Sequence, residues 1–459
     1  MKLSSSFRDP SGFIFLENNV LLRQVNICYK EHYEQLMATG LYEKLAGQGL
    51  LIQHDEVDVG RAQDDRAFKV IKPCKVPFIS YPYEWCFTQL KTAALNTLAI
   101  HKAAMEHGMT LKDASAFNIQ FLNGKPIHID TLSFEKFEEG RPWVAYRQFC
   151  QHFLAPLALM ARKDIRLQQL CRIYIDGIPL DLACRLLPLN TKLSPSLLMH
   201  LHLHANSQKR YANKSIKLHK VKVSKMAQFG LIDSLSNTVQ SLQWEPQDTE
   251  WADYYADTNY TEQGFDHKKK IIADFIDTIK PATVWDLGAN NGTFSRVAAA
   301  TGCAVISFDI DPSAVEKNYQ QVIANNENNI LPLLMDLINP SPGIGWANAE
   351  RSSLMDRGSV DLLMSLALIH HLAIGNNVPF GAIAETFAHL CSHLIIEFVP
   401  KEDSQVQRLL RSREDIFSNY NENHFINSFS EYFSIVNRNT VKESKRVLFL
   451  FSNKQARHG

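Results

Sequence analysis

The sequence lacks several features that would assign the protein to a special class. It has no apolar run of the ~20 residues that a membrane-spanning helix needs, and its longest such stretch is only Phe153 to Ala161. The first twelve residues are polar, so we expect no secretory signal, a cytoplasmic location and no membrane partner. None of the 8 cysteines stand in a Cys-x-x-Cys pair, which argues against a disulfide scaffold and a structural zinc site.

Charge of one sign is also lacking overall, but the charges are unevenly distributed. The 459 residues have a formal net charge of zero, with 45% hydrophobic residues, enough for real cores. Residues 151–225 carry 13 basic and 3 acidic side chains, whereas residues 226–459 carry 18 and 28. The basic segment, 192–225, is either a surface for phosphate, nucleic acid or an acidic carrier, or else a solvated linker or a face that docks on the acidic C-terminal domain. Since no aromatic residues interleave its lysines, a nucleic-acid partner is possible but not favoured.

Hydrophobic periodicity predicts two domains and a linker. The first half mixes strand-like and helix-like patterns, which predicts an α+β accessory domain over residues 1–190. The stretch 191–250 is polar and basic, and we assign it to a linker. From about residue 268, short β-branched runs alternate with helical segments, which predicts an α/β domain over residues 251–459. The expected elements of the first half are strands 12–16, 20–25 and 68–71 and helices 30–45 and 88–107.

The strongest chemical pattern begins at Thr283, where a strand runs into a glycine-containing turn that ends at Gly292. Glycines permit a tight turn and close approach of the backbone to a ligand. The helix that follows offers free N–H groups at its start. A second strand, residues 304–309, ends in Asp309, and a carboxylate there can accept both hydroxyl protons of a ribose. The pattern therefore predicts a nucleoside site.

Three further strands extend the pattern. Residues 330–335 lead to Asp336, and residues 360–365 run into a loop that contains His370 and His371. A fifth strand, residues 394–399, contains Glu397. This ordered set carries more weight than the glycines alone, because the third glycine of a dinucleotide-binding turn is not matched.

The set resembles the class I S-adenosylmethionine-dependent methyltransferases. Asp286, Gly288 and Gly292 match their first motif, and Asn290 stands where a middle glycine is common. The resemblance implies a Rossmann-like, seven-stranded, mostly parallel sheet and S-adenosyl-L-methionine as the cofactor. It implies that Asp309 holds the ribose hydroxyls, that Asp336 and its neighbour face the adenine, and that residues 365–371 lie beside the methyl group. The implied cofactor-binding residues are Asp286, Gly288, Asn290, Gly292, Asp309, Ile310, Asp336, Leu337 and Ser365.

The candidate catalytic residues are His370, His371 and Glu397. A hydroxyl acceptor must lose a proton during methyl transfer, and an imidazole with a pKa near 6.5 suits that task. In the resembling family such a histidine pair is often structural, so both roles stay open. Glu397 is flanked by apolar residues and needs a partner, and it either orients a histidine or makes a structural hydrogen bond. No metal site is predicted, because the alternating histidines 200, 202 and 204 have no carboxylate or cysteine near them in sequence.

A second pattern lies in the first half. Asp113 precedes Asn118 by five residues, and Asp130 follows twelve residues later, an order that phosphotransferases use for a catalytic acid and magnesium ligands. The stretch resembles a kinase-like lobe of the aminoglycoside-phosphotransferase or lanthipeptide-dehydratase kind, with Lys69 or Lys72 as the strand lysine. No glycine-rich loop stands near residues 12–25, however. An active kinase, a kinase-derived binding domain and a chance match stay open.

The whole chain is also similar to bacterial nodulation-type methyltransferases, in the loop 339–346 and the run 396–400. We favour methyl transfer to a small-molecule or glycan acceptor. The alternatives are an RNA or protein methyltransferase that uses the basic segment, and a non-catalytic cofactor-binding scaffold. Tyr260 is a candidate lid residue, and Trp346 either packs on a substrate or anchors a turn. No oligomeric state is predicted.

Overall fold

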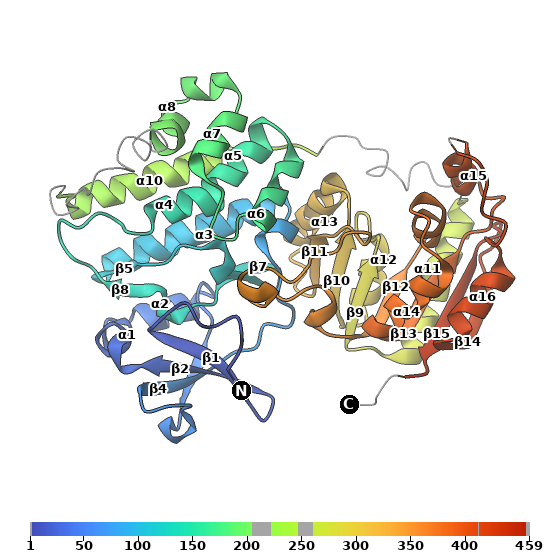
Figure 1. The fold of residues 1–459 in the computed structure, drawn as a ribbon, viewed down its shortest axis with the longest axis horizontal. Helices are drawn as coiled ribbons and strands as arrows, with labels where there is room; N and C mark the ends of the chain where they lie inside the picture. Colours follow the sequence, from blue (N-terminus) through green and yellow to red (C-terminus); the bar gives the residue numbers. More distant parts are fainter. Residues whose placement is uncertain (1, 204–221, 247–259, 412, 456–459) are drawn as a thin grey trace. The chain divides into compact units, whose positions relative to one another are not determined.

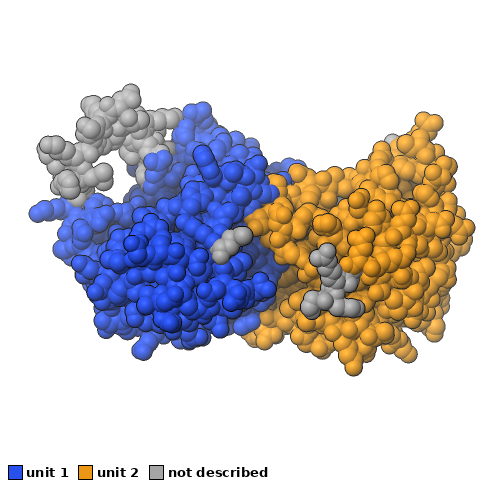
Figure 2. Space-filling model, turned by 60° about the horizontal axis from the view of Figure 1, so that its bottom comes forward, with its two compact units in different colours: residues 1–245, 343–351 blue, residues 246–342, 352–459 orange. Residues whose placement is uncertain are grey.

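The computed structural model describes residues 2–203, 222–246, 260–411 and 413–455 (Figure 1). The chain divides into two compact units (Figure 2). Unit 1 consists of Met1–Glu245 with Gly343–Arg351, and unit 2 of Pro246–Pro342 with Ser352–Gly459. Among the described residues, none of the helices combines the length and the apolar character that crossing a membrane requires.

The strands of unit 1 form one four-stranded antiparallel sheet, in the order β1-β2-β4-β3, and two short hairpin-like pairs, β5 with β8 and β6 with β7. Asn18 and Asn19 take positive φ angles of 49° and 61° between the first two strands, as a tight hairpin turn requires. The two strands expected over residues 12–16 and 20–25 are therefore confirmed, and they form a hairpin. The strands are β1 (Gly12–Glu17), β2 (Val20–Asn26), β3 (His54–Val57), β4 (Ala67–Pro73), β5 (Met109–Leu111), β6 (Ile119–Leu122), β7 (Lys125–His128) and β8 (Phe134–Lys136).

The first helices of unit 1 can be compared directly with the expected ones. The helix expected over residues 30–45 is two helices, because Gly40 takes a φ of 73° that ends the first and begins the second. The long helix expected over residues 88–107 is confirmed as α3. The helices are α1 (Lys30–Ala38), α2 (Leu41–Gly47), α3 (Phe87–Glu106), α4 (Tyr146–Phe149), α5 (Ala155–Arg162), α6 (Leu170–Ile173), α7 (Leu180–Leu186), α8 (Pro195–Leu197) and α10 (Lys225–Ser241).

Helix α10 lies inside the segment that the sequence assigns to a linker. Ile232, Leu235 and Val239 are buried, and their spacing of three and four residues puts them on one helix face. That face packs against α3 within unit 1. The two units meet in sequence at residues 245 and 246, so most of the expected linker belongs to the first unit.

Unit 2 contains one seven-stranded sheet in the order β11-β10-β9-β12-β13-β15-β14 (Figure 1). The first five strands in this order run parallel, and β15 pairs antiparallel with both of its neighbours. The seven-stranded, mostly parallel sheet that the family resemblance implies is thus confirmed. The strands are β9 (Thr283–Leu287), β10 (Ala304–Asp309), β11 (Ile330–Leu334), β12 (Val360–Ser365), β13 (Cys391–Phe398), β14 (Phe433–Thr440) and β15 (Val447–Asn453).

The order of the strands sets where a ligand can bind. The chain moves from β9 to β10 and β11 on one side, then returns to β12 on the other side of β9. In open α/β sheets, ligands bind at such a switch point, beyond the carboxyl ends of the strands. Helix α11 packs beside α12, and α14 beside α16 (Figure 1). The helices are α11 (Glu262–Ile279), α12 (Thr293–Ala299), α13 (Pro312–Ala324), α14 (Phe380–Leu390), α15 (Ser404–Leu410) and α16 (Glu422–Ser430).

Candidate active site

The turn after β9 is shaped by three residues with left-handed backbone. Gly288, Asn290 and Gly292 have φ angles of 72°, 51° and 78°. Asparagine is one of the few non-glycine residues that adopt this conformation readily, which explains how Asn290 can replace a glycine. A Cβ on Gly292 would lie 2.4 Å from Oδ1 of Asn318. The turn is held against β10, because the N–H groups of residues 288 and 289 donate to the carbonyl of Phe308 at 2.9 Å.

Asp309, at the end of β10, is fixed by the same turn. Its carboxylate accepts hydrogen bonds from the backbone N–H of Asn290 at 2.7 Å and of Asp311 at 2.9 Å. Burial raises the pKa of Asp309 to about 6, although these backbone donors favour the ionised form. Two backbone donors leave lone pairs free on a carboxylate, so Asp309 can accept further hydrogen bonds from a ligand.

Asp286 lies inside β9, two residues before Gly288. The hydroxyl of Ser295 donates to it at 2.6 Å, and the hydroxyl of Ser307 donates to Ser295 at 2.8 Å. Burial raises the pKa of Asp286 to about 7, with the Ser295 hydrogen bond acting in the opposite direction. A cationic group placed beside Asp286 would favour its ionised form.

A cavity of about 300 Å³ lies at the carboxyl ends of β9, β10, β11 and β12, and its lining includes Asp286, Asn290 and Asp309. The cavity has acidic side chains from three strands and an apolar wall from the loop after β12. Gly292, Ser365, His370 and Glu397 are not among its lining residues. The lining residues are Tyr260, Lys268, Asp286, Gly288, Ala289, Asn290, Phe294, Asp309, Ile310, Met335, Asp336, Leu337, Ile338, Leu366, Ala367, Leu368, His371, Leu372 and Asn376.

The two histidines after β12 have different environments. His371 lines the cavity, and burial together with the Arg446 cation lowers its pKa to about 4. His370 is fully buried, and neither of its ring nitrogens has a hydrogen-bond partner among the described residues. Burial lowers the pKa of His370 well below its ordinary value. Both rings are therefore neutral at pH 7, and a catalytic role for either one stays a prediction.

Glu397 is part of a buried charge network that the sequence did not predict. Its carboxylate accepts a hydrogen bond from the Lys268 ammonium at 2.6 Å and another from the Tyr260 hydroxyl. Arg446 lies 4.0 Å from it and forms a two-pronged ion pair with Asp403, at 2.8 and 3.1 Å. Burial would raise the pKa of Glu397, but the two cations hold it below its usual value.

The sequence does contain one sign of this network. Lys268 stands three and four residues before Ile271 and Ile272, on the buried face of α11. A lysine on the apolar stripe of an amphipathic helix is unusual, because lysine is almost never fully buried unless it is paired. Tyr260, the expected lid residue, lines the cavity and belongs to the same network.

The phosphotransferase-like residues of unit 1 stand beside the ends of its short strands. Asp113 follows β5, Asn118 precedes β6, and Asp130 follows β7. Asp130 is ion-paired with Arg23 of β2 at 2.6 Å, whereas Lys69, one of the two expected strand lysines, pairs with Glu56 instead. Burial would raise the pKa of Asp130, but Arg23 lowers it to about 2.

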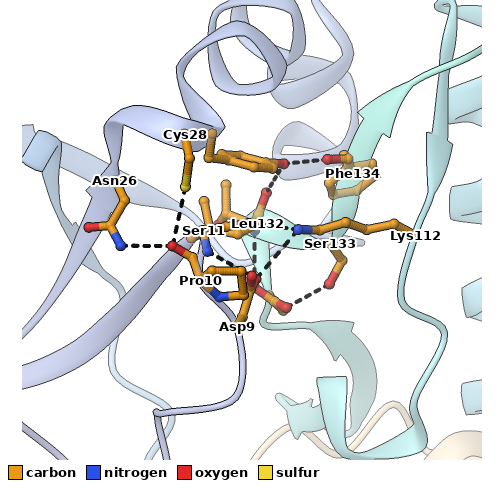
Figure 3. A network of polar contacts seen from close by, with 12 residues as sticks. Asp9, Pro10, Ser11, Asn26, Cys28, Lys112, Leu132, Ser133 and Phe134 are labelled. Carbon is orange, nitrogen blue, oxygen red and sulfur yellow. Dashed lines mark hydrogen bonds and ion pairs between the residues drawn. The ribbon is translucent and has the colours of Figure 1, made fainter. Parts of the chain in front are cut away.

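Figure 3 shows a polar network between the entry to β1 and the segment that carries these residues. The Lys112 ammonium donates to the Ser11 hydroxyl at 2.8 Å and lies 3.5 Å from the Asp9 carboxylate. The Ser133 hydroxyl donates to Asp130 at 2.7 Å. Arg23 and Lys112 thus join the sheet to the segment after α3. Among the described residues, no cluster of three or more histidine, cysteine or acidic side chains suits a metal ion.

The alternating histidines, the basic run and Trp346 are the remaining features that the sequence singles out. The ring of His200 is hydrogen-bonded to Tyr146 at 2.8 Å and to Ser234 at 2.9 Å, and His202 to Thr191 at 3.0 Å. His204 and most of the basic run, residues 204–221, lie outside the described residues, as does the segment before Tyr260. Trp346 is 75% exposed, so it anchors no turn by burial.

The strand order defines unit 2 as a domain of the class I methyltransferase fold. No family model matches the chain. Nodulation protein NoeA of Rhizobium meliloti (strain 1021) is 33% identical over 462 residues, which cover 99% of this chain and 96% of that protein. The chain belongs to the NoeA family, and its resemblance to nodulation-type proteins is confirmed.

Two solved structures resemble less than half of this chain. Magnesium protoporphyrin IX methyltransferase from Synechocystis PCC 6803 is 17% identical, covers 44% of this chain and 92% of that one, and has a TM-score of 0.32. N-methyltransferase NodS from Bradyrhizobium japonicum WM9 is 13% identical, covers 42% and 97%, and has a TM-score of 0.31. At these TM-scores the likenesses add nothing to the fold, which the strand order establishes.

Proposed function

We propose that the protein is a methyltransferase that moves a methyl group from S-adenosyl-L-methionine to a small-molecule or glycan acceptor. One observation carries this proposal: the Asp309 carboxylate, held by two backbone N–H groups, faces a cavity at the switch point of a class I methyltransferase sheet. A ribose offers two neighbouring hydroxyl donors, and Asp309 has the free lone pairs to accept them.

The cavity fits the cofactor. Asp336 and Leu337 supply a wall at the end of β11 against which adenine packs, and Ile310 supplies another next to the ribose. Gly288 and Asn290 bring the backbone of the turn to the amino-acid end of the cofactor. When bound, the cofactor supplies the electrophilic methyl group, while the protein supplies binding, orientation and exclusion of water.

The acceptor binds beside the loop after β12. His371 and Asn376 are the polar residues of this part of the cavity, among apolar neighbours such as Leu372. His371 is neutral at pH 7 and orients the acceptor by a hydrogen bond, or accepts its proton as the methyl group transfers. His370 and Glu397 remain candidate catalytic residues, and since they do not line the cavity they act through their neighbours.

We favour a small acceptor or the end of a glycan over a nucleic-acid base. The loop after β12 reads Leu366-Ala367-Leu368-Ile369 and has no Asn-Pro-Pro-aromatic sequence, which amine-methylating enzymes often carry. A protein or RNA acceptor bound through the basic segment, and a scaffold that binds the cofactor without catalysis, are the alternatives.

Calorimetry with S-adenosylmethionine and its demethylated product tests the cofactor. We expect both to bind the full-length protein, and binding of NAD or ATP with failure of both adenosyl compounds would overturn the proposal. Transfer of a tritiated methyl group into cell extracts tests the acceptor. Labelled product that passes a small-pore filter and resists nuclease and protease supports a small molecule or glycan, whereas nuclease-sensitive or protein-sized label overturns that choice.

A further inference from the structure

Arg351 is a half-buried arginine that has no acidic partner in the protein. It is the last residue of the segment Gly343–Arg351, which belongs to unit 1. Among the described residues, no acid forms an ion pair with it, and its side chain donates one hydrogen bond, from Nη1 to the carbonyl of Glu350 at 2.8 Å. An arginine that is withdrawn from water is usually paired, so the lack of an acid needs an explanation.

The unpaired part of this guanidinium is the edge with which other arginines of the protein hold a carboxylate. Arg8 donates from Nε and Nη2 to the two oxygens of Glu350. Arg446 uses the same two nitrogens to hold Asp403. In Arg351, Nε and Nη2 have no hydrogen-bond partner within the part of the chain that the structure describes, and neither atom is enclosed by protein. Two parallel N–H groups that are open to solvent match an oxyanion.

The flat face of the guanidinium packs on an aromatic ring. Its central carbon lies 4.5 Å from the ring centre of Phe117, which is a cation–π contact. Phe117 is buried and packs against Tyr81, with ring centres 6.2 Å apart. Burial lowers the pKa of Arg351, but a guanidinium stays charged at pH 7. Because rings replace water on this face, the cation attracts an anion at its open edge more strongly than it would in bulk water.

Glu350, the acid whose charge acts on Arg351, is committed to other partners. Its carboxylate is buried and accepts hydrogen bonds from Arg8 and from the backbone N–H of Trp346, the latter at 2.9 Å. His152 is buried as well, and burial together with the Arg351 cation lowers its pKa to about 4, so its ring is neutral at pH 7. The open edge of Arg351 therefore keeps a positive charge that this part of unit 1 does not neutralise.

From this arrangement we propose that Arg351 binds an oxyanion, the phosphate or carboxylate group of a small molecule, through its Nε and Nη2 edge. Arg351 belongs to unit 1 and is not among the residues that line the cavity of unit 2. The inference does not depend on methyl transfer and gives the protein a second ligand, which is recognised by its negative charge.

Inorganic phosphate and acetate are the probes, titrated into the full-length protein by calorimetry in a low-salt buffer that contains neither ion. We expect one of them to bind saturably, one ion per chain, with a Kd of about 1 mM. Tighter binding of phosphate supports a phosphate ester as the ligand, and tighter binding of acetate supports a carboxylate. If neither ion binds saturably, the inference is overturned without any variant being needed.

Two variants assign the binding to Arg351. We expect Arg351→Gln to weaken the tighter ion about tenfold or more, because the charge and the paired donors are lost. Arg351→Lys keeps the charge without the two parallel donors, so its affinity should lie between those of wild type and Arg351→Gln. Arg162→Gln is the matched control, because Arg162 is an exposed arginine of α5 in the same unit. Equal affinities of wild type and Arg351→Gln would overturn the inference.

Circular dichroism checks that the variants are folded, and a competition experiment in the wild-type protein needs no variant. The titration is repeated in the presence of saturating S-adenosylhomocysteine, and we expect the Kd of the ion to stay within threefold. Displacement of the ion would place it in the cavity of unit 2 and overturn the inference. If the protein binds the ion through Arg351 but binds no adenosyl compound, the proposed function fails while this inference stands.

Discussion

Replacement of Asp309 by asparagine should weaken the binding of S-adenosylhomocysteine about 100-fold. The change keeps the shape of the side chain but removes the charge, and its amide NH₂ must face one of the two backbone donors, from Asn290 or Asp311. Two hydroxyl donors to a carboxylate contribute about 1.5–3 kcal/mol each. We take about 3 kcal/mol for the loss of both hydrogen bonds, because water re-solvates part of the ribose. This energy corresponds to about a 100-fold change in affinity.

The pH dependence of binding is a second test of the role of the Asp309 carboxyl group. Ribose hydroxyls favour the ionised form of Asp309, and the pKa of this group in the free protein is raised by burial to about 6. The part of the affinity that Asp309 contributes should therefore rise with pH up to about 6 and level off above it, and it should fall about tenfold per pH unit well below 6. In Asp309→Asn this part of the profile should disappear, while a weaker dependence near pH 7 from Asp286 remains.

Calorimetry at pH 5, 6, 7 and 8 measures both effects, and Asp277→Asn, an exposed position on α11, is the control. Thermal unfolding followed by circular dichroism checks that Asp309→Asn is folded. An affinity within threefold of wild type, or a pH profile that keeps its rise near pH 6, would refute a ribose-binding role for Asp309.

Three further changes test other parts of the structure. Arg23→Met should lower the free energy of unfolding by about 3 kcal/mol, because it leaves the partly buried Asp130 without its cation. The double variant Arg23→Met with Asp130→Asn should recover most of the loss in urea titrations. Arg23 lowers the pKa of Asp130 to about 2 against the effect of burial. The stabilisation by this ion pair should therefore be present above about pH 4 and be lost as the pH falls towards 2. A loss below 1 kcal/mol in Arg23→Met at neutral pH would contradict a stabilising ion pair. Gly292→Ala should destabilise the protein and weaken nucleoside binding, because the new Cβ would lie 2.4 Å from Asn318, whereas Gly302→Ala, with a similar φ of 89° but open space around it, should cost only the ~1–2 kcal/mol of left-handed backbone. Equal costs for the two glycine variants would show that the contact with Asn318 does not matter. His370→Ala should lower turnover far more than the affinity for S-adenosylhomocysteine, and unchanged turnover would remove His370 from the catalytic candidates.

Much of unit 2 could be predicted because its signals are local. The strand that ends at Leu287, the turn through Gly288 and Gly292 and the acid at the end of β10 all lie within a few tens of residues. Each is enforced by backbone conformation or by burial of a parallel strand on both faces. The cavity then follows from the strand order, since carboxyl ends of adjacent parallel strands meet at one edge.

The failures have equally physical causes. Helix α10 was assigned to a linker because its three buried residues, Ile232, Leu235 and Val239, are diluted by polar neighbours. The helix over residues 30–45 is interrupted at Gly40, where a glycine can be tolerated in a helix or can end it, and only the fold decides which.

The sequence by itself determined the local arrangement of the proposed nucleoside site, because a glycine turn followed by an acid at a strand end lies within one short stretch of chain. The tertiary structure alone decided the partners of the buried charges. Lys268 and Glu397 are 129 residues apart in sequence, and Arg23 and Asp130 are also distant. An ion pair across such separations leaves no periodicity in the chain, since its geometry depends on how whole elements pack and not on the residues between them.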